Sequence, residues 1–258
     1  MSLYQKHISL FCILLLFVTF QFKVVAQCDM KNPLQELAID QPPIIQVPSN
    51  PAEWGNFKKA LIKWREQVRE EINYNDSLYD REDFQWVRTA FNCYFLMMYD
   101  QNFYDRKRNC YTIEKILDEG QKRFGGYDIV VLWHAYPRIG LDNRNQFDFY
   151  RDMPGGLAAL KKVADDLHAK GVKVYINYNP WDKGTCSENM HDIDALATIV
   201  KSIGADGIFL DTMEQGSEEF RQKLDMVKMG VVLESELALP IEGISTHHMS
   251  WAQWFNDS

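Results

Sequence analysis

Short apolar runs alternate with amphipathic segments along the chain from about residue 90 onward. The runs are almost wholly apolar, which predicts buried strands. The segments between them carry apolar residues three and four positions apart and end near a glycine, which predicts helices. The predicted strands lie at 94–99, 129–133, 172–176, 207–210 and 231–233, and the predicted helices at 113–123, 157–170, 193–203 and 218–227. Such an alternation is typical of right-handed βαβ units that build a parallel sheet.

Polar residues stand at the carboxyl end of all five predicted strands. They are Asp100, His134, Asn177 with Asn179, Asp211, and Glu234 with Glu236. Barrel enzymes build their sites at this rim, because the carboxyl ends of parallel strands meet there. No glycine-rich phosphate loop follows the first strand, which argues against a nucleotide-binding, doubly wound sheet. We therefore expect an α/β fold over residues 85–258, a TIM-type (β/α)8 barrel truncated after about five βα units.

The first 26 residues have the pattern of a secretory signal peptide. Basic residues precede an apolar run at 8–22, and the small residues Val24 and Ala26 fit an A-x-A-like cleavage site. The run is shorter than the roughly 20 apolar residues of a bilayer span, so we expect no membrane span after cleavage. The protein is therefore expected to be secreted or periplasmic, and Cys28 leaves lipid attachment as a minor option.

Residues 27–84 are expected to form an extended lead-in followed by a helical segment. Four prolines and little periodicity mark 27–50. A cap residue at Asn50 followed by Pro51 has the pattern of a helix start, and apolar residues then recur at helical spacing up to residue 68.

Composition narrows the class of protein. Of 258 residues, 46% are hydrophobic and 25% charged, which fits a globular protein with a core. The formal net charge of −8 argues against nucleic acid as a partner, because phosphate binding needs a basic surface. The five cysteines match no zinc-binding spacing. We therefore predict neither a metal nor a cofactor.

One segment at the fourth predicted strand, 205–214, reads ADGIFLDTME. It resembles the strand-four nucleophile motif of retaining α-glycoside hydrolases. In the α-glucosidase and α-xylosidase group, this motif runs Asp-Gly-x-aromatic-x-Asp-Met-Asn-Glu. The matching positions are Asp206, Gly207, Phe209, Asp211 and Glu214.

The resemblance spans roughly residues 90–239. The segment 171–181 is similar to strand three of α-galactosidase-like enzymes, where rim residues contact the sugar. The pattern also resembles barrel enzymes similar to endo-α-N-acetylgalactosaminidase, which carry the nucleophile on strand four and a glutamate acid/base on strand five. The resemblance implies that this chain is the N-terminal half of such a barrel.

Glycoside hydrolysis needs two carboxyl groups that flank the bond. Asp211 is the expected nucleophile, and Glu234 and Glu236 are the candidates for the acid/base. Asp211 and Glu234 are 23 residues apart (234 − 211), which is one helix plus one strand and makes their rim positions adjacent. An alternative places the acid on strand six, beyond residue 258.

The expected partner is an oligo- or polysaccharide, and several rim residues are candidates for contacts with it. An alternative function is a non-catalytic carbohydrate-binding module or a truncated, inactive barrel fragment. The candidate substrate-binding residues are Asp100, His134, Arg138, Asn177, Asn179, Trp181 and Asp182.

Overall fold

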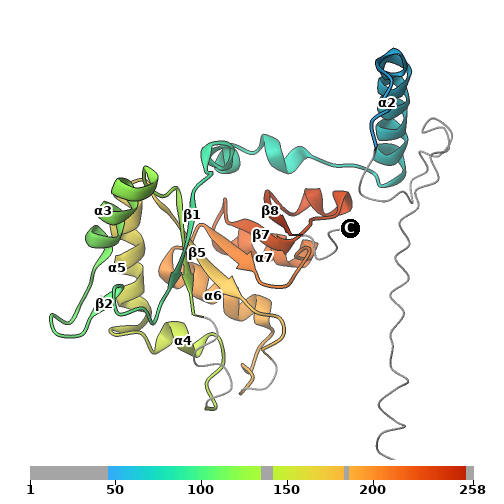
Figure 1. Ribbon diagram of the computed structural model, residues 1–258. Helices are drawn as coiled ribbons and strands as arrows, with labels where there is room; N and C mark the ends of the chain where they lie inside the picture. Colours follow the sequence, from blue (N-terminus) through green and yellow to red (C-terminus); the bar gives the residue numbers. More distant parts are fainter. Residues whose placement is uncertain (1–45, 135–141, 183–185, 254–258) are drawn as a thin grey trace, which may run out of the picture. The chain divides into compact units, whose positions relative to one another are not determined.

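The computed structural model describes residues 46–134, 142–182 and 186–253 (Figure 1). The chain divides into two compact units, with the boundary after Trp64, inside helix α2 (Trp54–Glu71). In the first unit, the 3₁₀ helix η1 (Pro51–Glu53) precedes α2, and the Asn50 side chain accepts a hydrogen bond from the Ala52 amide at 3.1 Å. This cap explains why the helical segment begins here.

The second unit is built on a six-stranded sheet in which every strand runs parallel to its neighbours. The order along the sheet, β1-β4-β5-β6-β7-β8, is the order in the sequence. The strands are β1 (Cys93–Met97), β4 (Ile129–Trp133), β5 (Lys173–Tyr178), β6 (Gly207–Leu210), β7 (Val232–Leu237) and β8 (Met249–Gln253). The predicted α/β fold, a TIM-type barrel cut short, is confirmed as a curled half-barrel.

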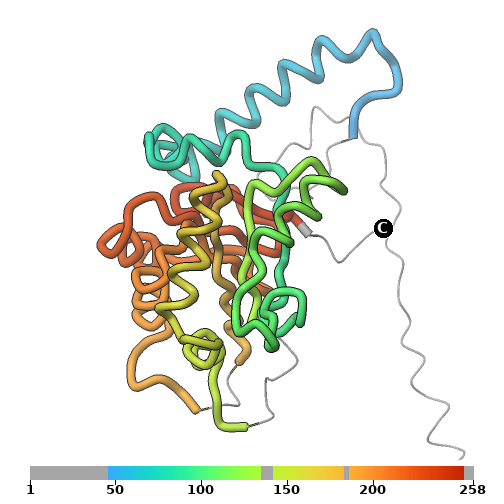
Figure 2. Tube along the Cα trace, turned by 90° about the vertical axis from the view of Figure 1, so that its left-hand side faces the viewer, coloured from blue at the N-terminus to red at the C-terminus, as the bar shows by residue number. Residues whose placement is uncertain are grey.

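Helices connect the successive strands and cover the outer side of the sheet. They are α3 (Ile113–Phe124), α4 (Asp148–Arg151), α5 (Gly156–His168), α6 (Asp192–Ile203) and α7 (Glu218–Val227), and the 3₁₀ helix η4 (Ile241–Ser245) precedes β8. Helix α5 packs on α6, and α6 on α7 (Figure 2). Among the described residues, no helix has both the length and the apolar character that a membrane crossing requires.

Ring contacts across the sheet show how strongly it curls. Phe95 in β1 and Trp251 in β8 have ring centroids 4.8 Å apart. Five strand spacings of about 4.8 Å would separate β1 from β8 by about 24 Å in a flat sheet. The Phe209 ring of β6 contacts both, at 4.8 Å and 4.6 Å. The concave face therefore closes around an aromatic cluster.

The two faces of the sheet bury different sets of side chains. On the outer face, strand residues such as Ile176 and Ile208 pack with the helices. On the concave face, Tyr175 and Phe209 pack with Phe84 of the 3₁₀ helix η3 (Glu82–Thr89), which follows η2 (Ser77–Asp80). Because strand side chains alternate between faces, this separation decides which rim residues can meet.

The sequence analysis missed strand β8 and several short elements. Strand β8 contains polar residues and lacks a continuous apolar run, so it resembled a loop. The antiparallel hairpin of β2 (Tyr104–Asp105) and β3 (Cys110–Tyr111) has only two residues in each strand, and α4 has only four. Neither the hairpin strands nor α4 is long enough to show a period.

Candidate functional site

Asp211 is the first residue after β6 and is almost fully buried, with 2% of its surface exposed. Its backbone amide donates to the Tyr178 carbonyl at 3.0 Å, which extends the parallel pairing of β5 and β6. Its carboxylate oxygen Oδ2 accepts a hydrogen bond from Nδ2 of Asn179 at 2.9 Å. The tips of two neighbouring strands therefore hold this carboxylate in one orientation.

The residue after Asp211 has a strained backbone. Thr212 has a φ of 58°, in the left-handed region. A positive φ is a true outlier for a β-branched residue, and such strain concentrates at functional sites. The Met213 amide donates to the Leu210 carbonyl at 3.3 Å, so Asp211 and Thr212 are the central residues of a tight turn.

Glu236 lies beside this turn on the neighbouring strand. Leu210 pairs with Ser235, so Asp211 and Glu236 are the residues that follow the last paired position of β6 and β7. Oxygen Oε2 of Glu236 accepts a hydrogen bond from the Thr212 amide at 2.6 Å. One of its carboxylate oxygens is therefore engaged by the backbone of the turn.

Glu234 lies one layer deeper and in a different environment. It pairs with Phe209, two residues before Asp211, so a strand spacing of about 4.8 Å and a rise of about 3.3 Å per residue put its Cα about 8 Å diagonally from that of Asp211. Burial, with 3% of the residue exposed, raises the pKa of Glu234 to about 7, although a hydrogen bond with the Trp251 side chain acts in the opposite direction. Its Oε2 has no hydrogen-bond partner among the described residues. A carboxylic acid with these properties can donate a proton near neutral pH.

Two asparagines of β5 and its rim lie on the same face as these acids. The Nδ2 of Asn177 donates to Oδ1 of Asn179, and both residues are buried. Gln146 fixes the backbone of Asn179 from both sides, accepting from its amide at 2.9 Å and donating to its carbonyl at 3.0 Å. Sequence analysis missed Gln146, because it follows no predicted strand and matches no motif.

Trp181 and Asp182 follow β5 on the same rim. Asp182 accepts a hydrogen bond from the Gln146 amide at 3.0 Å, which connects it to the Asn179 network. Trp181 is 41% exposed, so part of its indole ring faces solvent. Asp100, after β1, accepts from the Asn102 amide at 2.7 Å and thereby caps a local turn.

His134 lies on the opposite face from Asp211. It is fully buried against Phe149 and Tyr150, with ring centroids 5.7 Å and 5.2 Å away, and burial lowers its pKa to about 3. A contact between His134 and a sugar stays a prediction. Arg138 lies outside the described residues, so its predicted role also stays untested.

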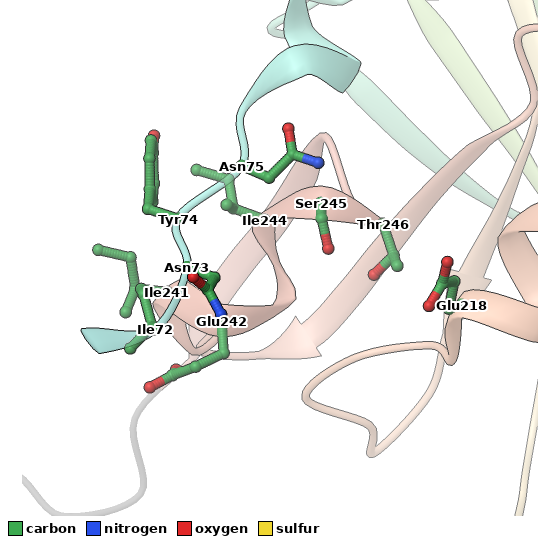
Figure 3. Close-up of a pocket in the computed structure, with 10 residues that line it drawn as sticks. All are labelled: Ile72, Asn73, Tyr74, Asn75, Glu218, Ile241, Glu242, Ile244, Ser245 and Thr246. Carbon is green, nitrogen blue, oxygen red and sulfur yellow. The ribbon is translucent and has the colours of Figure 1, made fainter. Parts of the chain in front are cut away.

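The cavity drawn in Figure 3 lies elsewhere in the second unit. It has a volume of about 290 Å³. Residues between α2 and η2, such as Asn75, line it together with Glu218 of α7 and with η4 and its flank at Thr246. Neither Asp211 nor Glu234 lines it. Within the described ranges, no group of three or more His, Cys, Asp or Glu side chains could hold a metal ion.

No protein-family model matches the sequence, and no curated protein matches it. The structure is similar to a pullulanase of Group B Streptococcus, at 13% identity and a TM-score of 0.38, over 60% of this chain and 29% of that one. It is also similar to a debranching enzyme from Nostoc punctiforme, at 13% identity and a TM-score of 0.39, over 59% of this chain and 48% of that one. A third similar structure is an α-amylase from Malbranchea cinnamomea, at 15% identity and a TM-score of 0.34, over 59% of this chain and 48% of that one. The aligned part is less than half the length of each of these proteins. At such values, function has to be inferred from the side chains of the site.

Proposed function

We propose that the chain is part of a secreted glycoside hydrolase that cleaves α-glycosidic bonds with retention of configuration. The observation that carries the proposal is the pair of buried carboxyl groups on adjacent strands, Asp211 and Glu234. They differ in the way a glycosidase requires. Asp211 is oriented by an amide donor, and the pKa of Glu234 is raised to about 7.

The reaction would proceed in two displacements. The Asp211 carboxylate attacks the anomeric carbon while the glycosidic C–O bond breaks, and Glu234 gives its proton to the leaving oxygen. Glu234, now a carboxylate, takes a proton from water, and the resulting oxygen displaces Asp211 from the sugar. The enzyme is thereby restored, and the two inversions give net retention.

The distances between strands are compatible with this mechanism. Retaining enzymes separate their carboxyl groups by about 5–5.5 Å, and inverting enzymes by about 6.5–9.5 Å. A diagonal Cα separation of about 8 Å allows the two side chains to converge to the shorter distance. Glu236 is closer along the rim, but the Thr212 amide engages one of its oxygens. Glu234 is therefore the preferred acid/base.

The substrate would meet the rim through the residues around Asn179. Asn177, Asn179 and Asp182 offer amide and carboxylate groups that can hydrogen-bond sugar hydroxyls. Trp181 offers a half-exposed aromatic face on which a sugar ring can stack. Asp100, His134 and Arg138 stay as further candidates, with an oligo- or polysaccharide as the partner. Export would depend on the predicted signal peptide of residues 1–26, which lies outside the described residues.

A second candidate function is binding of carbohydrate without cleavage. The cluster of Phe95, Phe209 and Trp251 fills the concave face below the rim. In that case the chain, or the protein to which it belongs, would hold a glycan at the rim and leave it intact. In a related alternative, Asp211 is still the nucleophile, but the acid/base is supplied by residues beyond 258.

The proposal can be tested with a panel of p-nitrophenyl α- and β-glycosides and the full chain. We expect release of nitrophenol from an α-glycoside, and proton NMR of the first product should show the α-anomer. Initial formation of the β-anomer would contradict retention. Binding of a glycan in calorimetry, without hydrolysis of any α-glycoside, would favour the non-catalytic candidate.

A further inference from the structure

The turn at Asp211 has two alternative backbone forms. Type I and type II turns have the same end-to-end hydrogen bond but differ by a flip of the central peptide, roughly 150° in ψ at the second residue. In this turn the central peptide joins Asp211 to Thr212. A φ of 58° at the third position, with no positive φ at Asp211, is the pattern of type II.

The local sequence favours the other form. The third position of a type II turn is normally glycine, since a side chain is strained at positive φ. Thr212 is β-branched and is therefore among the least suitable residues there. A type I turn would place Thr212 at negative φ without this strain. The observed form must be stabilised by a contact outside the turn.

Glu236 supplies that contact. Its Oε2 accepts the Thr212 amide at 2.6 Å, and this N–H belongs to the central peptide itself. Flipping the peptide to type I would turn the N–H away from Glu236 and break the bond. The Leu237 amide donates to the Met213 carbonyl at 3.1 Å, which fixes the distance between β7 and the turn. Glu236 is thus held beside the turn, where it can accept the Thr212 N–H in the observed peptide orientation only.

We propose that Glu236 is a positioning residue whose carboxylate holds the Asp211–Thr212 peptide in the type II orientation. We call this hydrogen bond between Glu236 and the Thr212 amide the lock. The lock sets the backbone from which the Asp211 side chain projects, and so directs its carboxylate toward Asn179. Its effect on turnover rests on the proposed function, whereas the lock itself does not. Glu236 then serves as a hydrogen-bond acceptor in the reaction cycle, and Glu234 alone remains as the proton donor among the two glutamates.

Three variants separate a lock from a proton donor. Glu236→Gln keeps an acceptor oxygen but cannot act as an acid, Glu236→Ala removes both, and Thr212→Gly removes the strain at the third turn position. We expect Glu236→Ala to lower kcat for p-nitrophenyl α-glycosides on the order of 100-fold with little change in KM, because Asp211 is misplaced. Glu236→Gln should keep most of the activity, and adding Thr212→Gly to Glu236→Ala should restore most of it. Glu242→Ala, at an exposed acid before β8, is the matched control and should leave kcat unchanged.

Two results would overturn the lock. One is a Glu236→Gln protein as inactive as Glu236→Ala, which would assign proton transfer to Glu236. The other is failure of Thr212→Gly to restore turnover in the Glu236→Ala background.

A measurement without substrate keeps the lock separate from the proposed function. The amide proton of Thr212 should be shifted downfield and protected from exchange in proton–nitrogen NMR spectra. It should lose both properties in Glu236→Ala but not in Glu242→Ala. An unshifted, unprotected Thr212 amide in the parent protein would contradict the lock. Absence of turnover in a parent protein with a protected amide would reject the proposed function alone.

Discussion

The two ends of strand β6 carry aspartates that lie in different surroundings. Before the strand, Asp206 contacts Nε2 of His168 at 2.6 Å, Nζ of Lys228 at 3.0 Å and the Val174 amide at 2.9 Å. Burial would raise the pKa of Asp206, but these hydrogen bonds and the Lys228 charge lower it to about 2. After the strand, Asp211 accepts from the neutral amide of Asn179 and precedes a strained residue.

This difference separates stabilising groups from groups that can react. Asp206 is surrounded by donors that favour its ionised form, so its charge is fixed and its role is structural. The opposite end holds a carboxylate that accepts a hydrogen bond from Asn179, a neighbouring acid with a raised pKa and a strained turn. Barrels commonly divide stability and chemistry between the two ends of their strands in this way.

The largest expected effect is loss of turnover on removing the Asp211 charge. Asp211→Asn keeps the shape of the side chain but cannot attack the anomeric carbon. We expect kcat/KM for a p-nitrophenyl α-glycoside to fall on the order of 10⁴-fold, with little change in Tm. Stopped assays measure kcat/KM, and thermal unfolding of the same preparation measures Tm. A variant that retains near-parental turnover would remove Asp211 from the reaction.

A smaller loss is expected at Glu234, together with a changed pH profile. Glu234→Gln removes the proton donor, which we expect to lower kcat on the order of 10³-fold. In the parent protein, turnover should fall as the pH rises through about 7, because Glu234 loses its proton there. An unchanged alkaline limb in Glu234→Gln would mean that another group titrates. That outcome would favour an acid beyond residue 258.

The same variant should change stability in a pH-dependent way. The pKa of Glu234 rises on folding from an ordinary value of 4.5 to about 7, so the folded state binds the proton more tightly. The parent protein should therefore lose stability between pH 4.5 and 7, by about 3 kcal/mol. Urea unfolding should show that Glu234→Gln gains stability above pH 7 and gains little at pH 4. An equal effect at both pH values would contradict the raised pKa.

The smallest effect concerns the other end of the strand. Asp206→Asn should lower the free energy of unfolding by about 2 kcal/mol at pH 7 and leave the specific activity of the folded fraction unchanged. Because folding lowers the pKa of Asp206 from 3.8 to about 2, this contribution is present above pH 4 and is lost as the pH falls toward 2. Lys162→Ala, which breaks an exposed pair with Asp166, is the control and should change stability by less than about 0.5 kcal/mol. A loss of activity without a loss of stability in Asp206→Asn would contradict a structural role for Asp206 and a reactive role for the opposite end of β6.

The alternation of strands and helices could be predicted because each buried strand of a parallel sheet is a continuous apolar run. The rim position of Asp211 followed from the end of such a run. Strand β8 could not be predicted, because its residues form no continuous apolar run and only its pairing with β7 shows it to be a strand.

The roles of individual rim residues were less accessible to sequence reasoning. His134 follows the same kind of run as Asp211, but the alternation of the strand directs it to the outer face against Tyr150. Gln146 and the contact between Glu236 and Thr212 depend on tertiary distances between separate loops. No local pattern encodes these distances.

The most direct test of the account is a covalent trap of the glycosyl-enzyme. A 2-deoxy-2-fluoro glycoside with a good leaving group slows both displacements and allows the sugar ester to accumulate. After proteolysis and mass spectrometry, we expect the label on the carboxylate of Asp211, and no label in Asp211→Asn. A label on Glu234, Glu236 or any other residue would contradict the assignment of Asp211 as the nucleophile.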